Sequence, residues 1–224
     1  MMKKTAIVTG ASKGIGWALS KALLEHDFEV IGTSRSGVIP IENQQLHAMQ
    51  LDVINQESIK KFAKDLKALN KPIDLLINNA GVGPDLRSPL PDEVSFDATF
   101  DVNVKGTVML TESIIELVKK GGMLINVSSK MGSIGSCERS GATAYRMSKS
   151  ALNMYTKILA NRYNGTYKLA SIHPGWVKTT IAPDNIENAR LTPEESAAKM
   201  MDFILSDFRH GIYWDAETNQ ELEW

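Results

Sequence analysis

The chain has 224 residues, 43% of them hydrophobic, which favours one larger domain spanning residues 1–224 over two small ones. Its 25 basic residues nearly balance 26 acidic ones, so no overall field draws the protein to nucleic acid or an anionic membrane. The single cysteine, Cys137, excludes a disulfide within the chain and predicts a reducing compartment, the cytoplasm. No apolar stretch approaches the roughly twenty residues that span a bilayer, so we expect a soluble protein.

Short apolar runs alternate with longer segments of helical periodicity. The runs predict strands at Thr5 to Thr9, Glu29 to Thr33, Ile73 to Ile77, Met123 to Val127 and Lys168 to Ile172. Strands that alternate with helices predict an α/β fold, a doubly wound parallel sheet of the Rossmann type with helices on both faces.

The C-terminal part adds one helix and one strand. Thr192 is a capping residue followed by Pro193 and two acids, which predicts a helix to about Leu205. A final strand is expected from His210 to Trp214, and the last ten residues have no predicted role.

The segment between the first strand and the first helix is rich in glycine. Gly10, Gly14 and Gly16 let the backbone turn sharply and approach a pyrophosphate, to which the helix N-terminus offers free N–H groups. The spacing Gly-x-x-x-Gly-x-Gly differs from the common dinucleotide fingerprint Gly-x-Gly-x-x-Gly. From this motif alone, a turn that merely joins strand and helix stays open.

The end of the second strand, Thr33-Ser34-Arg35, bears on the choice of dinucleotide. An acid there would accept hydrogen bonds from the adenosine ribose of NADH, whereas a cation would pair with the 2′-phosphate of NADPH. Ser34 stands in the acidic position, Arg35 follows, and Lys13 adds charge from the glycine turn. We predict NADPH over NADH; the alternative is two solvated surface cations.

Two further segments follow predicted strands, at the edge where ligands bind in parallel sheets. They are Asp52-Val53 after the third strand and Asn78-Asn79-Ala80-Gly81 after the fourth. The asparagine pair by itself is equally typical of a plain turn.

Candidate catalytic groups lie in the second half of the chain. Tyr145 and Lys149 are spaced i, i+4 and project from one helix face, which places an ammonium beside a phenol. Ser128-Ser129 brings a hydroxyl to the end of a strand, and Asn103 lies beside a helical apolar stripe. Taken singly, the pair is compatible with a solvated surface contact and Asn103 with a hydrogen-bonded core amide.

In order, these motifs resemble the short-chain dehydrogenase/reductase family over nearly the whole chain, most closely the carbonyl-reductase subgroup that includes Sniffer and the bacterial C-factor. The resemblance implies the catalytic tetrad Asn103, Ser129, Tyr145 and Lys149. Ser129 is preferred to Ser128 because the family's serine stands three residues before a glycine, here Gly132. The cofactor-binding residues it implies are Gly10, Ser12, Lys13, Gly14, Ile15, Gly16, Ser34, Arg35, Asp52, Val53, Asn79, Ala80, Gly81, Tyr145, Lys149, Pro174, Gly175, Val177 and Thr179.

The implied reaction is the reduction of a small aldehyde or ketone to an alcohol with NADPH. Tyr145 acts as general acid, and we expect Lys149 to favour the phenolate and so lower the pKa of Tyr145. The resemblance further implies that Lys149 holds the nicotinamide ribose and that Asn103 links it to solvent. It also implies a homodimer or homotetramer, although the short C-terminal half is compatible with a monomer. No metal site is expected.

Several alternatives remain. A signalling or cofactor-sensing protein of the C-factor type would bind the nucleotide without needing turnover, and a lyase or epimerase is disfavoured by the glycine spacing. The longer segment between Ser129 and Tyr145 either shapes specificity or is a surface excursion. Trp176 and Ile181 offer apolar contacts to substrate, unless Trp176 packs in the core.

Overall fold

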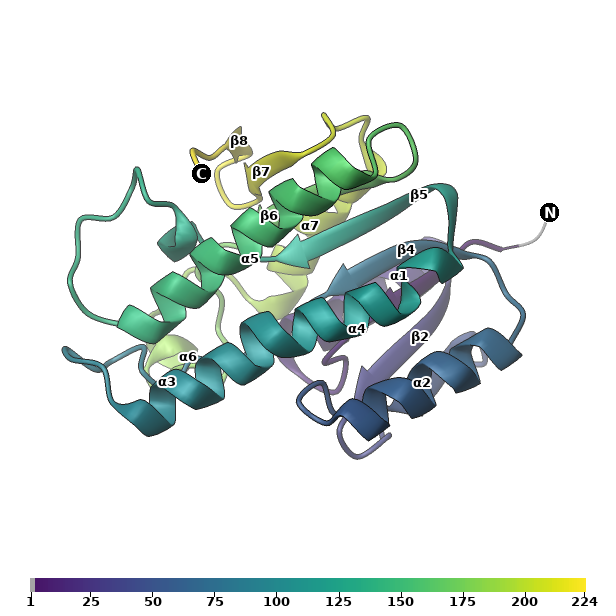
Figure 1. The fold of residues 1–224 in the computed structure, drawn as a ribbon, viewed down its shortest axis with the longest axis horizontal. Helices are drawn as coiled ribbons and strands as arrows, with labels where there is room; N and C mark the ends of the chain where they lie inside the picture. Colours follow the sequence, from purple (N-terminus) through teal and green to yellow (C-terminus); the bar gives the residue numbers. More distant parts are fainter. Residues whose placement is uncertain (1–2) are drawn as a thin grey trace.

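The computed structural model describes residues 3–224, in which eight strands form one sheet (Figure 1). Their order across the sheet is β3-β2-β1-β4-β5-β6-β7-β8, and all pairs are parallel except the last. The bounds are β1 Thr5–Val8, β2 Glu29–Ser34, β3 Leu46–Gln50, β4 Ile73–Asn78, β5 Val118–Val127, β6 Lys168–His173, β7 Ile212–Asp215 and β8 Gln220–Glu221.

Helices cover both faces of this sheet. One face carries α1 (Gly14–Glu25) and α7 (Pro193–Leu205); the other carries α2 (Gln56–Ala68), α4 (Thr107–Ile114) and α5 (Thr143–Arg162). Shorter elements connect them: α3 Glu93–Phe100, a π-helix at Asp101–Gly106, 3₁₀ turns at Ile115–Leu117 and Lys130–Gly132, and α6 Asn185–Asn188. This arrangement confirms the predicted doubly wound parallel sheet.

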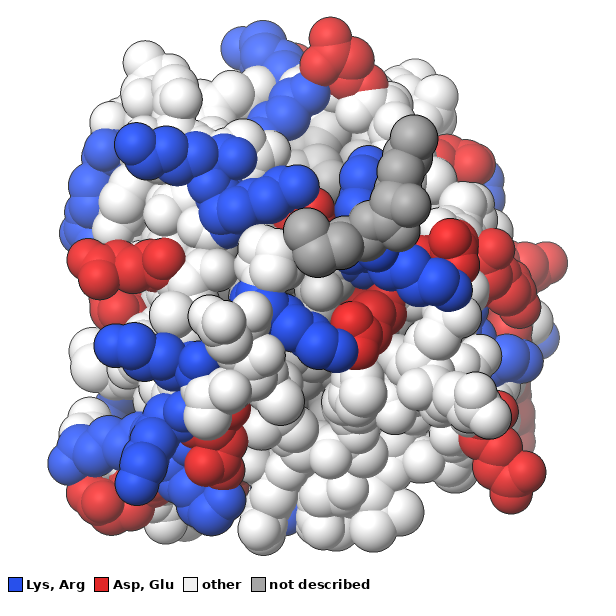
Figure 2. Space-filling model, turned by 90° about the vertical axis from the view of Figure 1, so that its right-hand side faces the viewer, with Lys and Arg blue, Asp and Glu red and all other residues white. Residues whose placement is uncertain are grey.

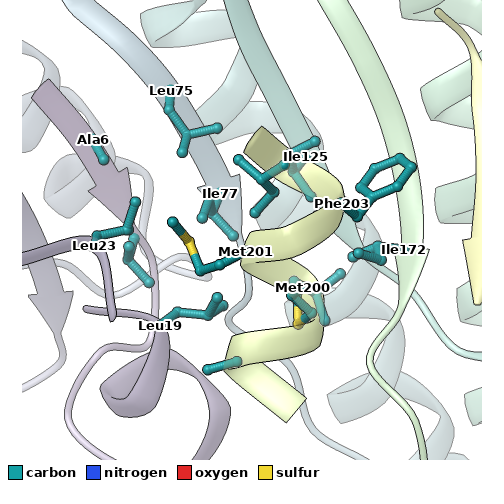
Figure 3. Close-up of a cluster of buried hydrophobic side chains, with 14 of the residues drawn as sticks. Ala6, Leu19, Leu23, Leu75, Ile77, Ile125, Ile172, Met200, Met201 and Phe203 are labelled. Carbon is teal, nitrogen blue, oxygen red and sulfur yellow. The ribbon is translucent and has the colours of Figure 1, made fainter. Parts of the chain in front are cut away.

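The core is two-sided because successive residues of a strand point to opposite faces. In β4, Leu75 and Ile77 pack in the cluster that includes α1 and α7, whereas Leu76 packs in the cluster of the opposite face. Figure 3 shows the first cluster, in which Met200 and Met201 of α7 lie among strand residues and the α1 leucines. Because the strands are buried on both faces, their sequences are apolar runs, which is why the sequence located them.

Strand boundaries deviate from prediction mainly in β5, which begins at Val118 rather than Met123. The added residues include Gly121, whose φ of +79° suits glycine, and the pairing of β4 with β5 shifts register there. The predicted helix after Thr192 is confirmed, with a capping box and a proline in its first turn. The last residues contribute the antiparallel edge strand β8, which the sequence did not predict.

The amino end of the sheet carries many paired charges. Glu29 contacts Lys71 and His47, and the buried carboxylate of Asp74 contacts Lys119. Figure 2 views this end, where Lys and Arg lie interspersed with Asp and Glu.

Among residues 3–224, every helix is too short or too polar to cross a lipid bilayer.

Candidate active site

The carboxyl ends of the central strands open onto a cavity of about 710 Å³. It extends from the turn after β1 to the start of α5 and the segment after β6. Most residues predicted to bind a dinucleotide line it, namely Gly10, Ser12, Lys13, Gly14, Ile15, Gly16, Ser34, Arg35, Asp52, Val53, Asn79, Ala80, Gly81, Tyr145, Lys149, Pro174 and Thr179. Gly175 and Val177 do not line the cavity.

The glycine turn after β1 needs glycine at specific places. Gly10 and Gly14 have φ of +67° and +57°, conformations that side-chain-bearing residues rarely adopt. A Cβ on Gly16 would lie 2.3 Å from the carbonyl oxygen of Gly10, so the helix start and the turn approach too closely for alanine. The cavity floor therefore presents bare backbone at the N-terminus of α1, as an anionic pyrophosphate requires.

Asn79 and Thr9 join two strand ends under the cavity. The Thr9 hydroxyl accepts hydrogen bonds from the backbone N–H of Asn79 and Ala80, both at 2.9 Å. The Asn79 amide in turn donates to the carbonyl of Thr9 at 2.8 Å. The Asn-Asn-Ala-Gly run thus forms part of a fixed platform rather than a plain turn.

Arg35 and Lys13 lie at the part of the cavity next to β2. Within residues 3–224, the exposed Arg35 guanidinium forms no ion pair, whereas the Lys13 ammonium donates to the Thr180 hydroxyl at 3.1 Å. The buried Ser34 hydroxyl donates to the Val38 carbonyl at 2.9 Å, so it shapes the turn after β2. The unpaired Arg35 guanidinium on the cavity wall is therefore available to pair with a phosphate group of a bound ligand.

Asp52 and Val53 follow β3 at the same edge. The Asp52 side chain accepts from the backbone N–H of Ile54 at 3.2 Å, and its own N–H donates to Ser58. These bonds hold the turn in place beside the cavity.

Asn103 lies in the π-helix and is 1% exposed. Its side chain accepts from the backbone N–H of Val82 and donates to the carbonyl of the same residue, both at 2.8 Å. It also donates to the Ser148 hydroxyl at 3.1 Å. A Cβ on Gly81 would lie 3.3 Å from Asn103 Oδ1 and 3.6 Å from Lys149 Nζ, so the absence of a side chain at Gly81 brings both groups to one spot.

Tyr145 lies in the first turn of α5 and is 8% exposed. The Ser129 side chain lies close enough to Tyr145 to lower the pKa of the phenol, against the larger effect of burial. Ser128, and not Ser129, lines the cavity. The buried Tyr213 hydroxyl donates to the Ser129 carbonyl and so fixes the serine from β7. Tyr145 and Lys149 thus both line the cavity, and Ser129 lies next to Tyr145 without lining it.

The pKa of Tyr145 does not show the net lowering that we expected from Lys149. Burial dominates and raises the pKa of Tyr145 to about 12, against a smaller lowering by the hydrogen bond with Ser129. Burial likewise lowers the pKa of Lys149 to about 8, and its ammonium donates to the Val127 carbonyl at 2.9 Å, 5.6 Å from the Tyr145 ring centre. Burial is therefore the largest cause of the pKa shift of both groups.

The segment after β6 borders the cavity opposite the glycine turn. Gly175 has φ of +91° and packs against Glu217. It therefore shapes the backbone turn after β6, although it does not line the cavity. Val177 is buried and pairs with Leu191. Ile181 lines the cavity, whereas Trp176 is 37% exposed and donates to Asn185 at 3.1 Å. Trp176 neither lines the cavity nor belongs to either buried cluster, and its contact with substrate stays a prediction.

The longer segment between Ser129 and Tyr145 does not line the cavity, apart from Tyr145 itself, and Cys137 on it is exposed. Across the opening, Arg87 contacts Asp184 at 2.7 Å and so joins the connection after β4 to the segment after β6.

Sequence reasoning missed several residues of the cavity wall and its support. Asp85, four residues after Gly81, is 0% exposed and accepts from the backbone N–H of Ala144 at 2.7 Å. An acidic residue so soon after the Asn-Asn-Ala-Gly motif could have been recognised in the sequence as a candidate for the same site. The lining residues that were not predicted are Thr33, Leu51, Ile54, Val82, Gly83, Pro84, Ala98, Asp101, Val102, Val127, Ser128 and Thr180.

Comparisons with known proteins agree with this geometry. An oxidoreductase of Bacillus subtilis, YusZ, itself uncharacterized, is 35% identical over 215 residues, which cover 88% of this chain and 74% of that protein. A short-chain dehydrogenase/reductase from Burkholderia multivorans, solved with bound NADP, is 27% identical with a TM-score of 0.88, and both chains are covered completely. The carbonyl reductase Sniffer of D. melanogaster is 27% identical with a TM-score of 0.85, again over 100% of both chains.

The model of the family described as short chain dehydrogenase matches residues 4–190, most of the sheet and the whole of the cavity wall. With the glycine turn, the Tyr145–Lys149 pair and these likenesses together, the chain belongs to the short-chain dehydrogenase family of oxidoreductases.

Proposed function

We propose that this protein is an NADPH-dependent reductase that converts a small aldehyde or ketone to an alcohol, with Tyr145 as general acid. The observation that carries the proposal is that Tyr145 and Lys149 line the same cavity as the glycine turn and Arg35, with the Ser129 side chain next to Tyr145. Residues 1–224 would then form one domain that holds both cofactor and substrate. Both the bound NADP of the Burkholderia protein and the carbonyl reductase activity in Sniffer's name support this choice.

The cavity fits NADPH by its own chemistry. Bare backbone at Gly10 and Gly14 would receive the pyrophosphate, and Arg35 would pair with the 2′-phosphate. Ser34 leaves no carboxylate at the end of β2 to repel that phosphate. When bound, NADPH supplies a hydride to the carbonyl carbon.

The protein's own residues handle the carbonyl oxygen. The Ser129 and Tyr145 hydroxyls donate hydrogen bonds to it, which polarises the carbonyl and stabilises the negative charge that develops on oxygen. Tyr145 then transfers its proton to that oxygen and completes the alcohol. With its pKa raised to about 12, Tyr145 is protonated at neutral pH, as a general acid must be.

Lys149 keeps a positive charge beside this proton transfer. At pH 7 the ammonium with a pKa of about 8 is mostly protonated, and it stabilises the phenolate that Tyr145 becomes on giving up its proton. Asn103, held against Val82, supports the backbone next to Lys149 and would connect the site to solvent.

The test is a spectrophotometric screen of aldehydes, ketones, diketones and quinones with NADPH and with NADH. We expect loss of reduced nicotinamide with at least one carbonyl class, and faster with NADPH. Tight NADPH binding without oxidation across the panel would contradict the proposal and favour a cofactor-sensing role. Conversion of a substrate without net NADPH consumption would instead indicate a lyase or epimerase.

Assembly into a dimer or tetramer stays a prediction. It is supported by exposed apolar side chains on α4 and α5, with Met109 40%, Met154 62% and Ile158 45% exposed. Light scattering of the purified protein measures the mass directly.

A further inference from the structure

A carboxylate that the sequence analysis did not single out caps the helix that carries Tyr145. Asp85 is 0% exposed and lies in the connection between β4 and α3. Its oxygens accept from the backbone N–H of Ala144 at 2.7 Å and of Tyr145 at 3.2 Å. These are the second and third N–H groups of α5, those that an N-cap side chain ordinarily satisfies.

α5 has no cap of its own. The residue at its N-cap position, Ala142, has left-handed backbone geometry with φ of +58° and offers no side-chain acceptor. Asp85 supplies the missing acceptor from a segment 60 positions away from Tyr145 in the sequence. Among residues 3–224, no Lys, Arg or His forms an ion pair with Asp85, so its charge is compensated by the N–H groups and the positive end of the helix dipole.

The segment that carries Asp85 is itself held at both ends. At one end Asn103 forms two hydrogen bonds with the backbone of Val82, and at the other the Ser88 carbonyl accepts from Ala142 at 3.0 Å. A Cβ on Gly83 would lie 3.0 Å from the Tyr145 ring, so this segment runs close beside the ring and leaves no room for a side chain there. Asp85 therefore connects a fixed loop of the cavity wall to the backbone of the catalytic turn.

We propose that Asp85 is a positioning residue of this enzyme: its buried carboxylate holds the first turn of α5, and with it Tyr145, in place. This inference rests on the proposed function, since it assigns a role in the same proton transfer. It adds a residue that acts through Tyr145 rather than on the substrate.

The electrostatic part follows from the charges around the phenol. Lys149 of α5 carries the positive charge, Asp85 the negative one, and Tyr213 of β7 is a further titratable neighbour. Burial is the main reason that the pKa of Tyr145 is high, and the negative charge of Asp85 raises it further. Without Asp85 the phenol would lose its proton at lower pH.

The first test compares Asp85→Asn with wild type and with Asp92→Asn. Asp92 caps α3 by accepting from Ser95 at 2.9 Å, at a fully exposed position, so its variant controls for the loss of a helix cap. We expect Asp85→Asn to bind NADPH as wild type does and to lose about tenfold to a hundredfold in kcat. Asp92→Asn keeps wild-type kcat.

A second readout does not depend on turnover. The chain has five tyrosines, so protein labelled with ¹³C at tyrosine Cζ gives a small set of resonances, and Tyr145→Phe assigns the one of interest. In Asp85→Asn the Tyr145 resonance should titrate at lower pH, with an ionisation constant larger by roughly threefold or more. If wild type reduces no carbonyl compound, the proposed function fails, but this titration still tests Asp85.

Unchanged kcat together with an unchanged Tyr145 titration in Asp85→Asn would overturn the inference, even if the melting temperature falls. Should Asp85→Asn not fold, Asp85→Glu keeps the charge and displaces it by one methylene. That variant is expected to lose kcat while NADPH affinity stays unchanged; wild-type kcat in Asp85→Glu would equally overturn the positioning role.

Discussion

At the amino end of the sheet, charged side chains have partners of opposite charge: Glu29 contacts Lys71, and Asp74 contacts Lys119. At the carboxyl end, Arg35 and Lys149 form no ion pair within residues 3–224, and both line the cavity. The first arrangement neutralises charge within the protein, whereas the second leaves positive charge toward a space that an anionic nucleotide fits. Ion-paired charge at the amino end should therefore contribute to stability, whereas the unpaired cations at the carboxyl end should govern binding and turnover.

The pH dependence of stability separates the two ends most strongly. His173, at the end of β6, has its pKa lowered to about 4 by burial, although Asp215 and Glu217 oppose this shift. Below pH 6.5 the unfolded state binds a proton that the folded state does not, so stability falls until about pH 4. The loss is about 3 kcal/mol, because each tenfold difference in proton affinity between the two states corresponds to about 1.4 kcal/mol. Urea unfolding of wild type and His173→Gln from pH 7 to pH 4 measures it.

The amino end responds to acid later. Burial disfavours ionised Glu29, but hydrogen bonds from Lys71 and His47 outweigh it and hold its pKa below 4.5. That stabilisation is present above pH 4.5 and is lost as the pH falls further. If the free energy of unfolding depended on pH identically in wild type and in His173→Gln, His173 would not cause the earlier loss of stability.

Gly16→Ala probes the closeness of the glycine turn to α1. Its Cβ would lie 2.4 Å from the Asn79 amide as well as against Gly10, so backbone must move. We expect about 2 kcal/mol of destabilisation and a matching loss of NADPH affinity. The matched control is Gly135→Ala, whose Cβ would approach only the flexible Glu223 side chain, most closely at its carboxylate. Calorimetry measures the stability and the NADPH affinity of both variants. Equal losses in Gly16→Ala and Gly135→Ala would contradict the packing argument.

Arg35→Gln tests whether the unpaired cation selects the cofactor. The variant loses a charged partner for the 2′-phosphate, worth about tenfold or more in NADPH affinity, while NADH affinity stays the same. Its stability should not change because the side chain is exposed and unpaired within the described chain. Fluorescence titration with both nucleotides measures the ratio; equal losses for the two would show that Arg35 does not recognise the phosphate.

Lys119→Met makes the corresponding change at the amino end. It leaves the buried Asp74 carboxylate with its hydrogen bond from Thr5 but without its cation. We expect about 1 kcal/mol of destabilisation, reduced because Lys119 is 47% exposed, and unchanged NADPH affinity. Weaker NADPH binding by Lys119→Met would contradict the claim that charge at the amino end does not affect nucleotide binding.

Sequence patterns located the parts of the molecule that repeat a simple rule. Buried parallel strands are apolar runs in the sequence, and ligand-binding residues gather at their carboxyl ends, so the strands, the glycine turn and the cavity wall near Asp52 and Asn79 were predictable. The tetrad was found only through its resemblance to a family, because Tyr145 and Lys149 four positions apart would equally suit a surface helix.

What the sequence did not reveal depends on contacts between distant segments. Asp85 reaches α5 across 59 positions to Ala144, and Lys13 reaches Thr180 across 167. The π-helix around Asn103 has no propensity signature, and the raised pKa of Tyr145 follows from burial that only the packed structure defines. No local pattern encodes these features.

The central claim is that Tyr145 donates the proton at a site where the nucleotide is already held by other residues. The measurement is kcat and NADPH affinity of Tyr145→Phe with the best carbonyl substrate from the screen. We predict wild-type NADPH affinity with kcat lower by about a hundredfold to ten-thousandfold, the usual contribution of a general acid. Wild-type turnover in Tyr145→Phe would contradict the account.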